Sequence, residues 1–142
     1  NRKKTRVVNL NQPEATLDFL GFTFQYDRDL RGRAHQYLNV FPSRKSLARL
    51  RERLREMSGP QWGWKPTTEL IGDVNRYLRG WGRYFRHGYP ARAFHAVNGF
   101  VPERLVRHLC RRSQRRYRPP ADQTWYAHLR TLGLQPLSAK RR

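Results

Sequence analysis

The chain has 142 residues, of which 37% are apolar, and this suffices for one small domain with a modest core. Thirty Lys and Arg residues against ten Asp and Glu residues give a formal charge of +20, so the folded chain repels itself unless a polyanion neutralises it. The sequence has no run of about 18 apolar residues, no signal-peptide pattern and no lipidation motif, which argues against membrane attachment. The single cysteine, Cys110, excludes an intrachain disulfide and fits a reducing cytosol, so we expect a nucleic-acid-binding protein of the cytoplasm.

Residues 1–42 are expected to be extended. The pattern of apolar residues predicts three strands, at Arg6 to Leu10, Leu17 to Tyr26 and Tyr37 to Phe41. A turn within Asp27 to Arg33 makes the last two strands a hairpin. Gly21 interrupts the middle strand, and a β-bulge is favoured there over the close approach of a ligand backbone.

A helix is expected to begin after Ser43, which is a good N-cap, and to continue through Met57. Its narrow apolar stripe consists of Leu47, Leu50, Leu54 and Met57. Gly59 and Pro60 end this helix. Trp62 and Trp64 follow in a loop, where covering the core is favoured over stacking on a base.

The second helix, Thr68 to His87, is the strongest signal in the chain. At about 100° per residue, one face collects Leu70, Ile71, Val74, Tyr77, Leu78, Trp81, Tyr84 and Phe85. The opposite side carries a ridge of Arg76, Arg79, Arg83 and Arg86. Gly80 costs about 0.5–1 kcal/mol relative to Ala inside a helix, and we predict that it lets a neighbouring backbone approach.

A third helical region begins near Ala91, and Pro102 predicts a kink or a fresh start within it. Beyond Pro102, one face carries Leu105, Val106, Leu109 and Cys110. The opposite face carries a basic patch of Arg104, Arg107, Arg111, Arg112, Arg115 and Arg116, for which phosphate binding is favoured over a merely solvated surface. Pro119 and Pro120 close this helix, and residues 121–137 predict a short amphipathic helix.

No catalytic or metal site is predicted. The acids are scattered, Asp27 and Asp29 lie in a presumed turn among arginines, and His108 and Cys110 point in different directions on a helix. The five histidines form no known zinc motif, and there is no glycine-rich phosphate loop.

Several of these strings resemble one family. The residues Asn75, Leu78, Arg79, Gly80, Trp81, Tyr84 and Phe85 are similar to the Asn-x-x-Leu-Arg-Gly-Trp-x-x-Tyr-Phe signature of the maturase-specific region, or thumb, of bacterial group II intron reverse transcriptases. Lys4 and Thr5, and Phe19 to Phe22, resemble segments that end the palm in that family. Arg111 to Arg115, Tyr117 to Pro120 and Leu132 to Leu134 resemble its usual C-terminus.

The resemblance implies a division into a palm-end β segment (1–42), a helical thumb and maturase domain (43–118) and a C-terminal extension (119–142). The expected fold is α+β and mainly helical, with a β-hairpin, a three-helix thumb-like bundle and a short last helix. The resemblance also implies that Leu20 and Gly21 belong to a primer grip. The family's metal-binding Tyr-x-Asp-Asp strand is absent from these residues, so Mg²⁺ and polymerisation are expected to require the palm, and no cofactor is expected here.

The implied function is that of an RNA-binding thumb that supports splicing and reverse transcription within a ribonucleoprotein. Its expected partners are intron RNA, the template-primer duplex, the rest of the reverse transcriptase polypeptide and, as a further candidate, target DNA. A free-standing basic scaffold or adaptor is the alternative, and a Tyr-x-Asp-Asp reading frame joined upstream of Asn1 would exclude it. An autonomous nuclease is disfavoured by the scattered acids.

Overall fold

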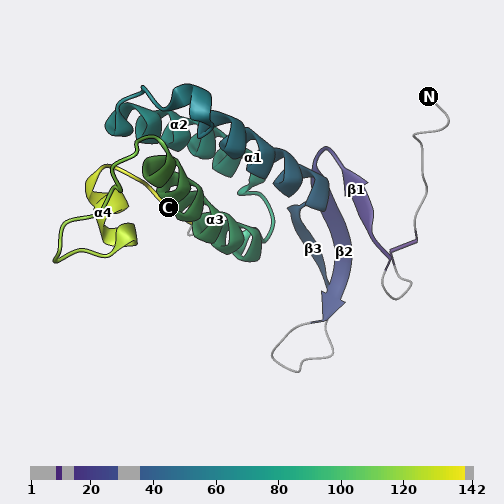
Figure 1. Cartoon of the computed structure of the whole chain (residues 1–142). Coiled ribbons are helices and arrows are strands. Elements are labelled where there is room, and N and C mark those ends of the chain that lie inside the picture. The colour runs from purple at the N-terminus through teal and green to yellow at the C-terminus, as the bar shows by residue number, and fades with distance from the viewer. Residues whose placement is uncertain (1–8, 11–14, 29–35, 140–142) are drawn as a thin grey trace.

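The computed structural model describes residues 9–10, 15–28 and 36–139. Its elements are β1 (Leu17–Phe19), β2 (Phe22–Arg28), β3 (Gln36–Pro42), α1 (Arg44–Met57), a 3-10 helix η2 (Pro60–Trp62), α2 (Thr67–Phe85), α3 (Ala91–Arg111) and α4 (Trp125–Thr131). In Figure 1 the strands lie beside the start of α1, and α4 lies at the opposite end of the helices. The predicted α+β, mainly helical fold is confirmed.

The three strands form one antiparallel sheet in the order β1-β2-β3. In the predicted hairpin of β2 and β3, Phe22 pairs with Pro42 and Arg28 pairs with Gln36. The centre of the predicted turn, residues 29–33, lies outside the described residues. So do residues 6–8 of the predicted first strand, and Asn9 and Leu10 are not in a strand.

Gly21 is not a bulge, and the predicted strand from Leu17 to Tyr26 is in fact two strands. Phe19 pairs directly with Phe22, so Leu20 and Gly21 form a two-residue hairpin turn. Both have positive φ, 53° for Leu20 and 86° for Gly21, as a tight turn that follows the twist of the strands requires. A glycine between apolar residues fits either arrangement, and only the pairing distinguishes them.

The helix predicted after Ser43 is confirmed as α1. The Ser43 side chain accepts a hydrogen bond from the Ser46 N–H and caps the helix. Leu50 and Leu54 are fully buried, and Leu47 and Met57 lie at the edge of the core. The expectation that the following tryptophans cover the core is wrong for Trp64, whose residue surface is 71% exposed.

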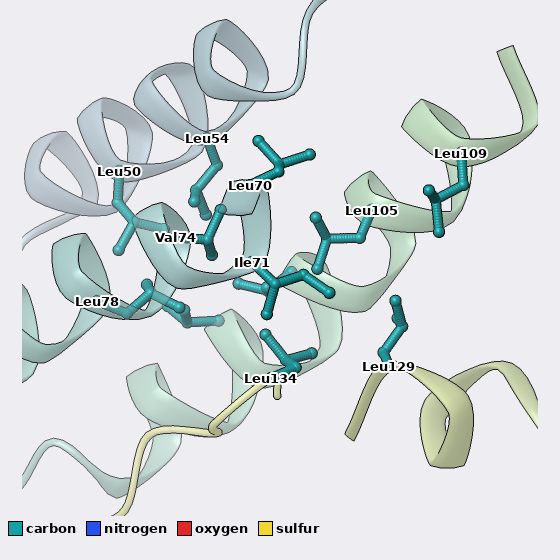
Figure 2. Packing of buried hydrophobic residues seen from close by; sticks show 12 residues of the cluster. Leu50, Leu54, Leu70, Ile71, Val74, Leu78, Leu105, Leu109, Leu129 and Leu134 are labelled. Carbon is teal, nitrogen blue, oxygen red and sulfur yellow. The ribbon is translucent and has the colours of Figure 1, made fainter. Parts of the chain in front are cut away.

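The second predicted helix is confirmed as α2. Its core side chains point toward those of α1 and α3 in Figure 2; Leu70, Ile71, Val74, Leu78 and Phe85 are buried. Tyr84 departs from the prediction, since it is about half exposed and donates its hydroxyl proton to the Leu20 carbonyl.

Helix α3 runs through Pro102 without a fresh start, contrary to that alternative in the prediction. It ends at Arg111, so Arg115 and Arg116 do not continue its basic face as predicted. Proline removes one backbone donor, the one that would pair with the Asn98 carbonyl, and the surrounding core retains the helix. Val97, Val101 and Leu105, on both sides of Pro102, are all buried.

Residues 133–137, which follow α4, close the bundle. The Asn75 amide on α2 donates to the Gly133 carbonyl at 2.7 Å and accepts from the Gln135 N–H at 3.0 Å. The Asn98 amide on α3 bonds in the same two-sided way to the backbone of Leu137, at 2.9 and 2.8 Å. Leu134 is buried among the leucines of the core, as Figure 2 shows.

The predicted role of Gly80 is wrong. Apart from its chain neighbours and the backbone of its own helix, a Cβ atom at Gly80 would meet no atom of the described residues within 4 Å. The close approach occurs at Gly82 instead, where a Cβ would lie 2.8 Å from Leu137 Cδ2. Helical periodicity places both glycines beside the apolar face, and the path of residues 133–137 decides which one is needed.

Candidate nucleic-acid interface

The predicted arginine ridge of α2 lies on the surface. Arg76, Arg79, Arg83 and Arg86 are all exposed. The side chain of Arg76 is 80% exposed, and its Nη1 lies 3.6 Å from Asp73 Oδ1. At 1.5 Å per residue the ridge extends roughly 15 Å along the helix, which is long enough to contact several phosphates of one strand.

The arginines at the end of α3 surround a pocket. It has a volume of about 190 Å³ and is lined by Ser58, Pro60, Gly63, Arg104, Arg107, His108, Arg111 and Arg112. We call it the Ser58 pocket. Its lining residues include four arginines and no acid, so the pocket is strongly electropositive.

The inner wall of the Ser58 pocket is built on the end of α1. Ser58 is buried, and its hydroxyl donates to the Leu54 carbonyl at 2.7 Å. The same oxygen accepts from Nε and Nη2 of Arg104 at 3.3 and 3.2 Å, and the Ser58 carbonyl lies 3.0 Å from His108 Nδ1. Burial lowers the pKa of Arg104, and the nearby Arg107, Arg55 and Arg111 guanidinium groups lower it further.

The last arginines of the predicted patch lie elsewhere. Arg115 and Arg116 are exposed in the irregular segment after α3. Arg112 remains beside the pocket, with its guanidinium carbon 5.9 Å from the centre of the Tyr117 ring. The structure therefore gathers Arg104, Arg107, Arg111 and Arg112 and separates them from the other two.

A second hollow of about 410 Å³ lies between α1 and α2. It is lined by Arg53, Glu56, Met57, Trp62, Lys65, Leu70, Asp73, Arg76 and Tyr77. Lys65 Nζ lies 2.6 Å from Asp73 Oδ2 and 4.9 Å from the centre of the Trp62 ring, so this lysine is already paired. Burial raises the pKa of Tyr77, against the opposing charge of Arg53. Arg76 lines this hollow and is also the first arginine of the ridge.

The hairpin turn of Leu20 and Gly21 packs against the C-terminal end of α2. The Gly21 carbonyl accepts from the Ser43 N–H and the Ser46 hydroxyl, both at 2.8 Å. The Phe22 ring stacks on Tyr84, with ring centres 5.2 Å apart. Leu20 is 68% exposed. The turn thus lies beside the last residues of α2, where the ridge ends at Arg83 and Arg86.

The motif residues of α2 have structural roles. Asn75 holds residues 133–135, and Trp81 packs between Phe85 and Phe94, with ring centres 4.5 and 5.9 Å apart. Sequence reasoning missed Ser58 and Asn98, and it considered His108 only as a metal ligand. The Ser-Gly-Pro string that ends α1 could have indicated a tight turn at Ser58, whereas no local sequence pattern indicates a role for His108.

Among the residues described, no group of three His, Cys, Asp or Glu side chains could hold a metal ion. No helix in the described part of the chain is long and apolar enough to cross a membrane.

Comparison with protein-family models gives a match. The family model described as "Group II intron, maturase-specific domain" matches residues 47–125, which run from α1 to the first residue of α4. No curated protein matches the chain. The match spans more than half of the 142 residues and covers both the α2 ridge and the Ser58 pocket. The chain therefore belongs to the group II intron maturase-specific domain family.

Proposed function

We propose that this chain is the thumb and maturase part of a group II intron reverse transcriptase and that it grips intron RNA and the template-primer duplex. Membership in the maturase-specific family implies RNA binding in splicing. The observation that supports the finer proposal is the presence of two arginine sets, the exposed ridge of α2 and the lining of the Ser58 pocket. Arginines of both sets can neutralise phosphates of one bound RNA.

In this proposal the chain contributes binding and positioning rather than a reaction centre. The arginines of the α2 ridge and the Ser58 pocket neutralise phosphates, and Arg115 and Arg116 extend the contact beyond α3. The turn of Leu20 and Gly21, anchored to α2 by Tyr84, lies near the primer end. The remaining polypeptide would supply polymerisation, and target DNA is a further partner.

The test is the affinity for intron RNA of the full chain, measured against salt concentration. If about six phosphates are contacted in duplex RNA, log affinity falls with log salt at a slope of roughly 5. Replacing Arg79, Arg83, Arg107 and Arg111 together by Gln should weaken binding and flatten this slope. A wild-type affinity that does not respond to salt would refute phosphate binding.

A comparison of affinities for intron RNA and for an unrelated RNA distinguishes the proposed function from that of an adaptor. A thumb and maturase domain should bind its intron RNA more tightly than an unrelated RNA of equal length at the same salt concentration. Equal affinity for both RNAs would favour a free-standing basic scaffold.

A further inference from the structure

The Ser58 pocket combines excess positive charge with a buried nitrogen that lacks a partner. Arg107 has one carboxylate nearby, Glu103 at 3.9 Å, and both side chains are more than half exposed. Within the described residues no carboxylate pairs with Arg104, Arg111 or Arg112. A pocket with this lining is complementary to an anion.

His108 carries the sharper signal. The residue is 4% exposed, and its Nε2 is buried without a hydrogen-bond partner among the described residues. Its Nδ1 lies 3.0 Å from the Ser58 carbonyl, which can only accept, so Nδ1 carries a proton. When the ring is doubly protonated, Nε2 is a donor in need of an acceptor, and leaving it unpaired is unfavourable. An anion oxygen in the pocket would supply that acceptor.

Arg104 is fixed in a position suited to the same ligand. Nε and Nη2 both contact the Ser58 hydroxyl, and a guanidinium group has five N–H donors, so at least two remain available. Burial lowers the pKa of Arg104 and the crowding of like charges lowers it further, and an anion would relieve that crowding. The pocket volume of about 190 Å³ leaves room for a tetrahedral oxyanion.

We propose that the Ser58 pocket binds a single phosphate group of the RNA backbone, with donors from His108 Nε2, Arg104, Arg107 and Arg111. The identity of the anion as an RNA phosphate rests on the proposed function, whereas the anion chemistry of the pocket does not. The pocket differs from the α2 ridge because two of its donors, Arg104 and His108, are anchored by Ser58, so it fixes the position of one phosphate where the ridge attracts many.

The first test uses inorganic phosphate and the full chain. Ring nitrogens of the histidines are observed by long-range ¹H–¹⁵N NMR during a phosphate titration at constant ionic strength and pH. We expect the Nε2 signal of His108 to move. His128 is the internal control, because it is also buried and its Nε2 already bonds to the Tyr117 hydroxyl at 2.6 Å. An unmoved His108 signal would overturn the proposal.

Two double variants of equal charge locate the site. Arg107→Gln with Arg111→Gln should abolish the phosphate response of His108. Arg79→Gln with Arg83→Gln, on the exposed ridge, should retain it. Loss of the response in both variants would show a general charge effect and overturn the pocket assignment.

The RNA test uses His108→Asn, whose amide can still donate to the Ser58 carbonyl but has nothing at the Nε2 position. Loss of one charge-assisted hydrogen bond should weaken RNA binding about ten-fold. The melting temperature of His108→Asn shows whether the variant is folded. If it is unstable, the phosphate titration of the wild-type protein remains the test of the pocket. RNA would be overturned as the source of the anion by two results together: a phosphate response of His108 in the wild-type protein, and an unchanged RNA affinity in a stable His108→Asn protein. A wild-type protein that responds to phosphate but binds no RNA would refute the proposed function and leave the anion pocket intact.

Discussion

Gly80 and Gly82 lie two residues apart on α2, yet their surroundings differ completely. Gly80 faces open space, whereas Gly82 is buried against Leu137. The side of α2 that carries Gly82 and Asn75 is closed by residues 133–137, and the side that carries Arg79 and Arg83 is open. Sterics and hydrogen bonds therefore govern one face of this helix, and electrostatics govern the other.

This difference between the two faces predicts which positions of α2 tolerate substitution without loss of stability. On the closed face, each added atom must displace a packed neighbour. On the open face, substitutions of the arginines should leave stability within about 0.5 kcal/mol and act on RNA affinity. Measuring stability and RNA binding in parallel separates the two faces.

The largest effect is expected for Leu134→Ala. This side chain is 4% exposed, and truncating a buried leucine costs about 2–5 kcal/mol. Urea unfolding measures the loss, and the matched control is the exposed Leu20→Ala, which should change stability by less than about 0.5 kcal/mol. Similar midpoints for the two variants would show that residues 133–137 do not belong to the core.

A smaller loss is expected for Gly82→Leu. The new side chain would collide with Leu137, and overpacking costs about 1–3 kcal/mol. Gly82→Ala should be milder, because the Leu137 side chain can move. If Gly80→Leu proved more destabilising than Gly82→Leu, the assignment of the two faces would be reversed.

On the open face, Arg79→Gln with Arg83→Gln should leave the melting temperature unchanged. If each arginine contacts one phosphate, the slope of log affinity against log salt should fall by about 1.4–1.8. Binding assays at several salt concentrations measure this. Replacing exposed Arg92 and Arg130 by Gln changes the charge equally and provides the control. Equal effects would indicate general attraction rather than contact by the ridge.

The smallest effect is expected for Gly80→Ala. The added methyl group meets no described atom, and alanine is the better helix former, so stability should rise by about 0.5–1 kcal/mol. Thermal unfolding can resolve this gain. A destabilised Gly80→Ala protein would mean that another part of the chain approaches α2 at this position.

Much of the fold could be predicted because its signals are local. The Ser43 cap and the 3.6-residue apolar period of α2 each depend on residues within a few turns of one another. The Gly21 turn was misassigned because a bulge and a two-residue turn both favour glycine. Of the two alternatives predicted at Pro102, the fresh start does not occur, because the burial of Val97, Val101 and Leu105 outweighs the loss of one backbone donor.

The sequence by itself determined the helical faces, the arginine ridge, the excess positive charge and the family motif, since each is a property of composition or spacing. Only the tertiary structure decided which arginines meet. It brought Ser58 at the end of α1 to His108 and Arg104 on α3, and it set residues 133–137 against Gly82 rather than Gly80. Such contacts join residues 46 or more positions apart, and no local period encodes which of them come together.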